Sequence, residues 1–462
     1  MKKISLILLL SALSACANTG GLSDADSQES DDGKPGFSST YKAPKAPTTL
    51  IKNVNVYNGI GDLLEQTDVL LQGGKIISVG TDLAAPQEAS ILDGADRWLT
   101  PGLIDVHSHM GVYSSPSIAS LADGNEITGP NTADVWAEHG VWPQDPNFEK
   151  ALAGGITTVQ ILPGSANLFG GRGVVLKNVP SVTMMGMKFP DAPHSLKMAC
   201  GENPKRVYGE KGGPYSRMGN MAGYRKAWID AKAYKEKWDA YNGGKSSEPP
   251  KQDLTLDTLM GVLNGEIMVH NHCYRADEMA NMLELAKEFD FQITAFHHAV
   301  EAYKIAPLLA DHDVCAVVWA DWWGFKQEAF DMVRENAALV ELAGACAIIH
   351  SDDEIQVQRL NQEVAKVWNA ANRMGMELTK AQAITWLTHN AARSIGLEDQ
   401  IGSVAEGMNA DLVLWSDDPF SVYAKADTVW IDGAVRFDRS WAQPERTSDF
   451  NLGIITPEGD RP

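Results

Sequence analysis

Residues 103–109 read LIDVHSH, an apolar run that ends in two histidines one residue apart. The run predicts a buried β-strand, in which side chains two residues apart lie on the same face. His107 and His109 are therefore expected side by side at the end of this strand. Two imidazoles placed in this way can bind one divalent metal ion, although a single pair is also typical of histidines with a purely structural role.

Apolar strand-like runs alternate with amphipathic helical segments from residue 102 to residue 394, and the helical period is clearest at 277–289. Repeated βα units over this length predict an α/β fold, a (β/α)8 TIM barrel, with a doubly wound open sheet as the alternative. An eighth strand, at residues 181–185, has a weaker pattern than the other seven. Those seven cover residues 103–106, 157–162, 196–200, 266–269, 292–296, 314–318 and 346–349.

Short strands separated by turns also occur on both sides of this region. Neither side has enough strands for a stable sheet of its own. We therefore expect residues 47–101 and 395–445 to form one small β-sandwich domain that flanks the barrel of residues 102–394.

The N-terminus has the pattern of a bacterial export signal over residues 1–16. Two lysines precede an apolar run, and the sequence LSAC at 13–16 resembles a lipobox, in which Cys16 is lipidated after cleavage. Residues 17–46, rich in Ser, Asp, Gly and Pro, predict a flexible linker. We expect a lipoprotein of the outer membrane that faces the periplasm and meets the membrane only through this lipid. A cleaved signal without lipid is the alternative.

The charge of the chain disfavours some partners. Its 39 Lys and Arg residues against 60 Asp and Glu residues give a formal net charge of -21. Such an excess repels nucleic acids and anionic surfaces. A small-molecule partner is therefore expected, and homo-oligomerisation stays open.

Four further cysteines lie in or beside apolar strand-like runs. Their even number would permit disulfides in an oxidising compartment. Small buried thiols are nevertheless common in such runs, so unpaired core cysteines are expected. The four are Cys200, Cys273, Cys315 and Cys346.

Metal-ligating residue types follow several other predicted strands. His270 and His272 end one strand, His297 and His298 end another, and Asp352 follows the last. The carboxyl ends of barrel strands converge on one face, so these groups should meet. Imidazoles and a carboxylate that converge on one point indicate a site for a divalent ion such as Zn²⁺.

Three segments, in order, resemble the amidohydrolase superfamily. Residues 99–109 (LTPGLIDVHSH) resemble the motif that opens its barrel, and residues 387–393 (LTHNAAR) resemble its closing helix. Residues 402–413 (GSVAEGMNADLV) resemble the return to its β-domain. The resemblance extends over residues 48–440, and imidazolonepropionase-like and Xaa-Pro dipeptidase-like members look most similar.

The resemblance implies roles for the candidate residues. One or two metal ions, with zinc expected, would be held at the strand ends. His298 is preferred over His297, and His270 over His272, which then faces the substrate. The implied ligands are His107, His109, His270, His298, Asp352 and one residue of the fourth strand.

The fourth-strand ligand has two candidates. Relatives use either a carbamylated lysine or a glutamate, and residues 196–204 contain both Lys197 and Glu202. Glu202 lies at the predicted strand end, whereas Lys197 lies five steps of roughly 3.3 Å before it, about 16 Å back. Spacing therefore favours Glu202, with Lys197 as the alternative bridging ligand.

Three polar residues beyond the strand ends are candidates for substrate binding. Asn167 and Arg172 lie in a Gly-rich segment after the second strand, which is equally typical of a plain hairpin loop. Arg275 could bind a substrate carboxylate or be a surface residue at a helix start.

The function implied is metal-dependent hydrolysis of an amide. A metal lowers the pKa of water to about 7, and Asp352 can take its proton as general base and pass it to the leaving nitrogen as general acid. Dipeptides or N-acyl amino acids are the expected substrates, with cyclic amides as the alternative. Deamination is another possible reaction, and deaminases of this superfamily usually have a His-x-x-Glu sequence after the fifth strand. Here Cys273 stands three residues after His270, which disfavours deamination. A non-catalytic lipoprotein that binds a metal or ligand is the alternative of another class.

Overall fold

The computed structural model describes residues 36–441. The predicted signal at residues 1–16, the lipidation site Cys16 and most of the predicted linker lie outside these residues. The described chain from Ser38 onward belongs to one compact unit.

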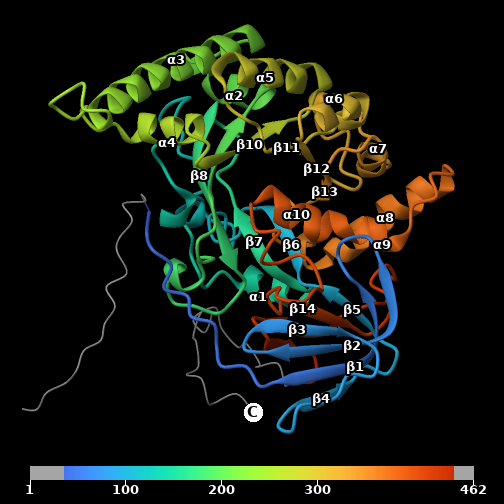
Figure 1. Cartoon of the computed structure of the whole chain (residues 1–462). Coiled ribbons are helices and arrows are strands. Elements are labelled where there is room, and N and C mark those ends of the chain that lie inside the picture. The colour runs from blue at the N-terminus through green and yellow to red at the C-terminus, as the bar shows by residue number, and fades with distance from the viewer. Residues whose placement is uncertain (1–35, 442–462) are drawn as a thin grey trace, which may run out of the picture. The chain divides into compact units, whose positions relative to one another are not determined.

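An eight-stranded, nearly closed barrel sheet forms the centre of this unit, so the mixed α/β class with a TIM-like barrel is confirmed (Figure 1). Seven of its strands coincide with the seven that the sequence predicts most clearly. In sheet order the strands are β6 (Leu103–Ser108), β7 (Ile156–Ile161), β8 (Phe169–Lys177), β9 (His194–Ala199), β10 (Ile267–Cys273), β11 (Ala295–His298), β12 (Cys315–Val318) and β13 (Ala347–Ile349).

The eighth strand is not where the sequence analysis put it. Residues 181–185 form a bend and the start of a 3-10 helix, Met184–Gly186, so that prediction is wrong. The missing strand is β8, which pairs antiparallel with both β7 and β9. Its glycines, which are depleted in strands, hid it. Gly171 has φ +112°, and a Cβ there would lie 2.3 Å from the carbonyl oxygen of Val135, so glycine is required at this crossing.

Helices pack around the barrel, and α3, α4 and α5 lie close together at one end of the view in Figure 1. The predicted helix at 277–289 is confirmed as α5. None of the helices within residues 36–441 combines the length and apolar character that crossing a membrane requires. The helices are α1 (Pro146–Ala153), α2 (Glu202–Tyr208), α3 (Arg217–Asn242), α4 (Leu254–Leu263), α5 (Ala276–Phe289), α6 (Ala306–Asp311), α7 (Asn336–Leu342), α8 (Leu360–Arg373), α9 (Lys380–Ile384) and α10 (His389–Ser394).

A second sheet joins strands from both ends of the described chain, and β5 pairs antiparallel with β14 at the junction. A facing second layer, which a sandwich requires, is not confirmed, and the domain boundaries stay a prediction. The strands are β1 (Thr49–Tyr57), β2 (Leu63–Gln72), β3 (Lys75–Gly80), β4 (Ser90–Asp93), β5 (Trp98–Pro101), β14 (Leu412–Trp415), β15 (Ala426–Ile431) and β16 (Ala434–Asp438).

A buried ion cluster connects this sheet to the barrel. Lys177 of β8 lies 3.3 Å from Asp411 and 2.9 Å from Asp432. Tyr41, within the stretch predicted as linker, donates a hydrogen bond to Asp432 at 2.5 Å. Part of that stretch therefore contacts the folded body.

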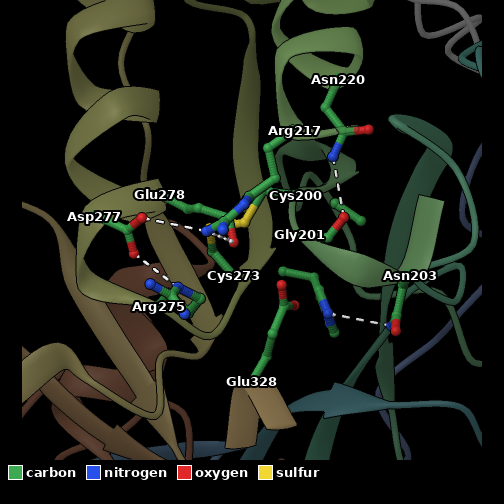
Figure 2. Close-up of a disulfide and its surroundings, with 12 residues drawn as sticks. Cys200, Gly201, Asn203, Arg217, Asn220, Cys273, Arg275, Asp277, Glu278 and Glu328 are labelled. Carbon is green, nitrogen blue, oxygen red and sulfur yellow. Dashed lines mark hydrogen bonds and ion pairs between the residues drawn. A yellow bond between two sulfur atoms is a disulfide. The ribbon is translucent and has the colours of Figure 1, made fainter. Parts of the chain in front are cut away.

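The four described cysteines form two disulfides, so the expectation of unpaired thiols is wrong. Cys200 pairs with Cys273 at a Cα–Cα distance of 5.2 Å (Figure 2). Cys315 pairs with Cys346 at a Cα–Cα distance of 4.4 Å. Each bond joins neighbouring strands: the N–H of Cys200 donates to the carbonyl of His272, directly before Cys273. These distances suit disulfides, but they depend on strand register, which the cysteine positions in the sequence do not reveal.

Candidate active site

Three predicted ligands meet at the carboxyl ends of β6 and β13. The Nε2 atoms of His107 and His109 lie 3.4 Å and 3.3 Å from Oδ1 of Asp352. The Nδ1 atoms are engaged elsewhere, His109 with the carbonyl of Leu162 at 2.8 Å and His107 with Nδ1 of His297 at 2.8 Å. Both imidazoles therefore present Nε2 toward the carboxylate, and the three donor atoms form a group that could hold a metal.

A second group of nitrogen donors lies next to the first. Donor atoms of His107, His298 and His350 all lie within 4.8 Å of one another. Nδ1 of His298 and both ring nitrogens of His350 are buried without a hydrogen-bond partner among the described residues. Buried polar atoms without partners are costly, and a divalent ion would supply the missing partner, so these residues fit a metal.

The imidazoles are held in their neutral form. Burial lowers the pKa of His107 and of His298 well below the usual value, and neighbouring basic groups add to the effect. Burial likewise lowers the pKa of His350 to about 3, against a smaller opposing effect of Asp352. Neutral imidazoles keep the lone pair that a metal ligand needs.

The structure places Lys197, and not Glu202, beside these histidines. Nζ of Lys197 lies 3.4 Å from Nε2 of His107 and donates to the carbonyl of Pro163 at 3.1 Å. Burial lowers the pKa of Lys197 to about 7.

Glu202 instead begins α2, with its carboxylate 3.5 Å from Nζ of Lys326. Lys197 reaches the strand end because β9 ends at Ala199, only two residues after Lys197, and a lysine stem spans that distance. This placement favours Lys197 as the fourth-strand ligand.

Of the two histidines of β10, His272 lies next to His298, whereas His270 lies next to His297. Nδ1 of His270 lies 2.7 Å from Nε2 of His297, and Nδ1 of His297 in turn contacts His107. His270 is therefore connected to His107 through the His297 ring. The ring of His272 lies 4.5 Å from that of His298, and its Nδ1 is buried without a partner among residues 36–441. Geometry therefore favours His272 over His270 beside the metal donors.

The three proposed substrate-binding residues have partners elsewhere. The amide of Asn167 donates to Thr132 at 2.7 Å, and the guanidinium of Arg172 lies 4.1 Å from the ring centroid of Trp136. Arg275 donates to Asp277 at 2.9 Å, toward which it points in Figure 2. Arg172 lies within β8 rather than in a loop, and none of these three contacts is with a residue of the histidine cluster.

Asp105 is a site residue that the sequence analysis missed. Its carboxylate accepts hydrogen bonds from Oγ of Ser351 at 2.5 Å and from the N–H of His107 at 3.3 Å. Burial raises the pKa of Asp105 to about 6 against these hydrogen bonds. A charged residue inside a buried strand, two positions before His107, was the available signal. Asp105 ties β6 to the segment that carries Asp352.

Two site residues adopt left-handed backbone conformations. His298 has φ +66° and Asp352 has φ +54°, both rare for residues other than glycine. Such conformations are energetically costly and persist only where the surrounding structure enforces them, which is common at functional sites. They add to the evidence that this strand-end cluster is the functional site.

A barrel with histidine and carboxylate donors at the carboxyl ends of its strands defines the class of metal-dependent barrel hydrolases. The amidohydrolase family model matches residues 353–437. A solved amidohydrolase from Thermotoga maritima is 36% identical with a TM-score of 0.77, and the match covers 85% of this chain and 100% of that one. This chain belongs to the amidohydrolase family.

Two curated relatives extend the comparison. Amidohydrolase tasK from Hapsidospora irregularis is 31% identical over 404 residues, which are 82% of this chain and 41% of that protein. The chain thus spans less than half the length of that relative. An imidazolonepropionase from Brucella anthropi is 23% identical over 380 residues, covering 77% of this chain and 88% of that protein. The relatives support a hydrolase.

Proposed function

We propose that this chain hydrolyses carbon–nitrogen amide bonds with a bound divalent metal, and that its substrates are dipeptides or N-acyl amino acids. The observation that carries the proposal is the cluster in which His107, His109 and Asp352 lie beside the buried His298 and His350. The unpartnered ring nitrogens of His298 and His350, next to a carboxylate, suit Zn²⁺ better than they suit a packed core.

One or two ions would be held by His107, His109, His298 and Asp352, with His272 or His350 completing the set. When bound, such an ion lowers the pKa of water to about 7 and polarises the carbonyl that water attacks. His107 and His298 are buried, whereas His109 and Asp352 are partly exposed, so the donor group opens to solvent on their side.

Lys197 is proposed as the ligand shared between the ions, in its carbamylated form. Addition of its neutral amine to carbon dioxide forms the N–C bond of the carbamate and releases one proton. The carbamate presents two oxygens where the structure has one Nζ, 3.4 Å from His107. The lowered pKa of Lys197 keeps part of the amine neutral near pH 7.

Asp352 is proposed as general base and then general acid. Its carboxylate can accept a proton from the attacking water and deliver it to the leaving nitrogen. Its segment is fixed by the hydrogen bond between Ser351 and Asp105. The carbon–nitrogen bond breaks, and the products are a carboxylate and an amine.

Hydrolysis of a cyclic amide is the second candidate, favoured by the imidazolonepropionase relative. A metal- or ligand-binding lipoprotein without catalysis is the alternative of another class. A protein that had lost catalysis would be expected to lack some of the metal-ligating residues, whereas the cluster described above retains its donors.

We also propose that the chain is anchored to the outer membrane through lipid on Cys16 and faces the periplasm. The two disulfides support an oxidising compartment outside the cytoplasm. Its partner would be a small amide or peptide, not a nucleic acid, and homo-oligomerisation stays open.

The test is incubation of the zinc-loaded protein with a pooled library of dipeptides, N-acyl amino acids and cyclic amides, read by mass spectrometry. Appearance of free amino acids supports the proposal. Addition of water to rings alone would favour the cyclic amide candidate. An unchanged library with folded, metal-loaded protein would favour the binding protein.

A further inference from the structure

Lys326 is a half-buried cation beside the histidine cluster to which the proposed mechanism gives no role. It lies between β12 and α7, directly before a 3-10 helix, Gln327–Ala329, and its side chain is 20% exposed. Nζ lies 4.3 Å from the centroid of the Tyr274 ring, donates to Oδ1 of Asn203 at 3.1 Å, and lies 3.5 Å from the Glu202 carboxylate.

The partners of Lys326 connect it directly to the cluster. The Tyr274 ring lies 4.6 Å from the ring of His272 and 5.5 Å from that of His298. Nδ2 of Asn203, labelled in Figure 2, lies 3.3 Å from Nε2 of His272. One side chain therefore separates the ammonium from the groups proposed to perform the chemistry.

The ammonium of Lys326 has three N–H donors, so it can take a further acceptor beside Asn203 and Glu202. Burial lowers its pKa, although Glu202 acts in the opposite direction and Arg206 adds to the lowering. An anion brought to Nζ would replace hydration that burial has removed. Arg275, the candidate for binding a substrate carboxylate, and Arg172, a further candidate for substrate binding, are engaged elsewhere.

An aromatic wall, defined as Trp319, Trp322 and Phe325, lies on the same side of the cluster. The ring of Trp319 stacks on that of His298 at 4.2 Å, and the ring of Trp322 stacks on Trp319 at 5.5 Å. Phe325 meets Trp319 edge-on at 5.7 Å. Nε1 of Trp319 is buried without a hydrogen-bond partner in the described part of the chain. Trp319 itself is buried, so the accessible apolar surface of the wall comes from the half-buried Trp322 and the exposed Phe325.

We propose that Lys326 binds the free carboxylate of the substrate while an apolar or aromatic group of the same substrate packs on the aromatic wall. In an N-acyl amino acid or a dipeptide, one carbon atom separates the scissile nitrogen from the terminal carboxylate. This short separation matches the single side chain between Lys326 and the cluster. The substrate class is thus an amide with an α-carboxylate and an apolar side chain, and this inference rests on the proposed function.

The test compares N-acetyl-L-phenylalanine with its primary amide, which lacks the carboxylate, on full-length zinc-loaded protein. Lys326→Met should raise KM for the acid about tenfold or more, the loss expected for one charge-assisted hydrogen bond, while kcat changes little. The preference for acid over amide should disappear, and Lys326→Arg should restore most of it. Lys235→Met, at a half-buried lysine of α3 that pairs with Asp239, is the matched control and should keep the preference.

Calorimetric binding of the same two compounds to Asp352→Asn protein keeps the test independent of turnover. Weaker binding of the acid in the Lys326→Met background, with binding of the amide unchanged, supports the subsite even where hydrolysis fails. Equal loss for both compounds, or an unchanged preference, would overturn it. Absence of hydrolysis with Lys326-dependent binding would count against the proposed function alone.

Discussion

Nζ of Lys197 lies 3.4 Å from Nε2 of His107, although 90 residues separate them in the sequence. Each residue is only 1% exposed. Nζ of Lys197 also donates to the carbonyl of Pro163, and Nδ1 of His107 contacts His297, so both groups are held at the centre of the cluster. A metal shared between a modified Lys197 and His107 would replace their direct contact, with Asp352 beside them.

Lys197→Met should abolish stable metal binding, whereas Glu202→Gln should leave the metal content unchanged. The reason is that Lys197 touches the histidine cluster and Glu202 pairs with Lys326. Metal per chain, measured by elemental mass spectrometry after gel filtration, checks this. Loss of metal from Glu202→Gln but not from Lys197→Met would reverse the assignment.

Asp352→Asn should lower kcat by about 100-fold or more, the usual contribution of a general acid–base group, and leave the protein folded. The amide keeps the shape of the carboxylate but cannot take the proton. Initial rates and thermal unfolding should be measured together. Asp353→Asn, next to it in the sequence, is the control, and a fully active Asp352→Asn would remove Asp352 from the mechanism.

Replacing Cys315 and Cys346 together by alanine should lower the free energy of unfolding by about 2–4 kcal/mol, because the bond closes a loop in the unfolded chain. Urea unfolding of the double variant and the wild type measures the difference. Thiol titration of the unfolded, unreduced chain from residue 36 onward should find no free thiol. Four titratable thiols would show that the cysteines are unpaired.

Glu278→Gln should stabilise the protein more at high pH than at low pH. Burial, and then the charge of Glu328, raise the pKa of Glu278 to about 7, above that of a glutamate in the unfolded chain. The folded state therefore binds more protons between these values, and the stability contributed by Glu278 falls as pH rises through them. Urea unfolding should show a gain at about pH 8 and little difference at about pH 4. The exposed Glu284→Gln on the same helix is the control, and a pH-independent gain would contradict the prediction.

Local pattern was enough to predict much of the barrel and part of its site. Seven strands are apolar runs bounded by polar residues, and His107, His109, His298 and Asp352 follow strand ends, where convergence can be expected. Predicting these residues required only the two-residue period of a strand and the convergence of strand ends in a barrel.

The remaining features depend on which segments become neighbours. The glycine-rich β8 pairs as a strand only because β7 and β9 flank it. Lys197 reaches His107 across the barrel, and the disulfides depend on strand register. His350 could not be recognised as a candidate ligand from the sequence, because only the fold brings its ring next to those of His107 and His298.

The most direct test of a metal-dependent amide hydrolase is a zinc titration of metal-free protein during turnover of an N-acyl amino acid in ¹⁸O-labelled water. The account predicts that the initial rate rises with bound zinc, levels off when the His107–Asp352 site is filled, and places one ¹⁸O in the released carboxylate. Hydrolysis at full rate without metal, or saturation of the site with zinc and no hydrolysis of any amide, would contradict it.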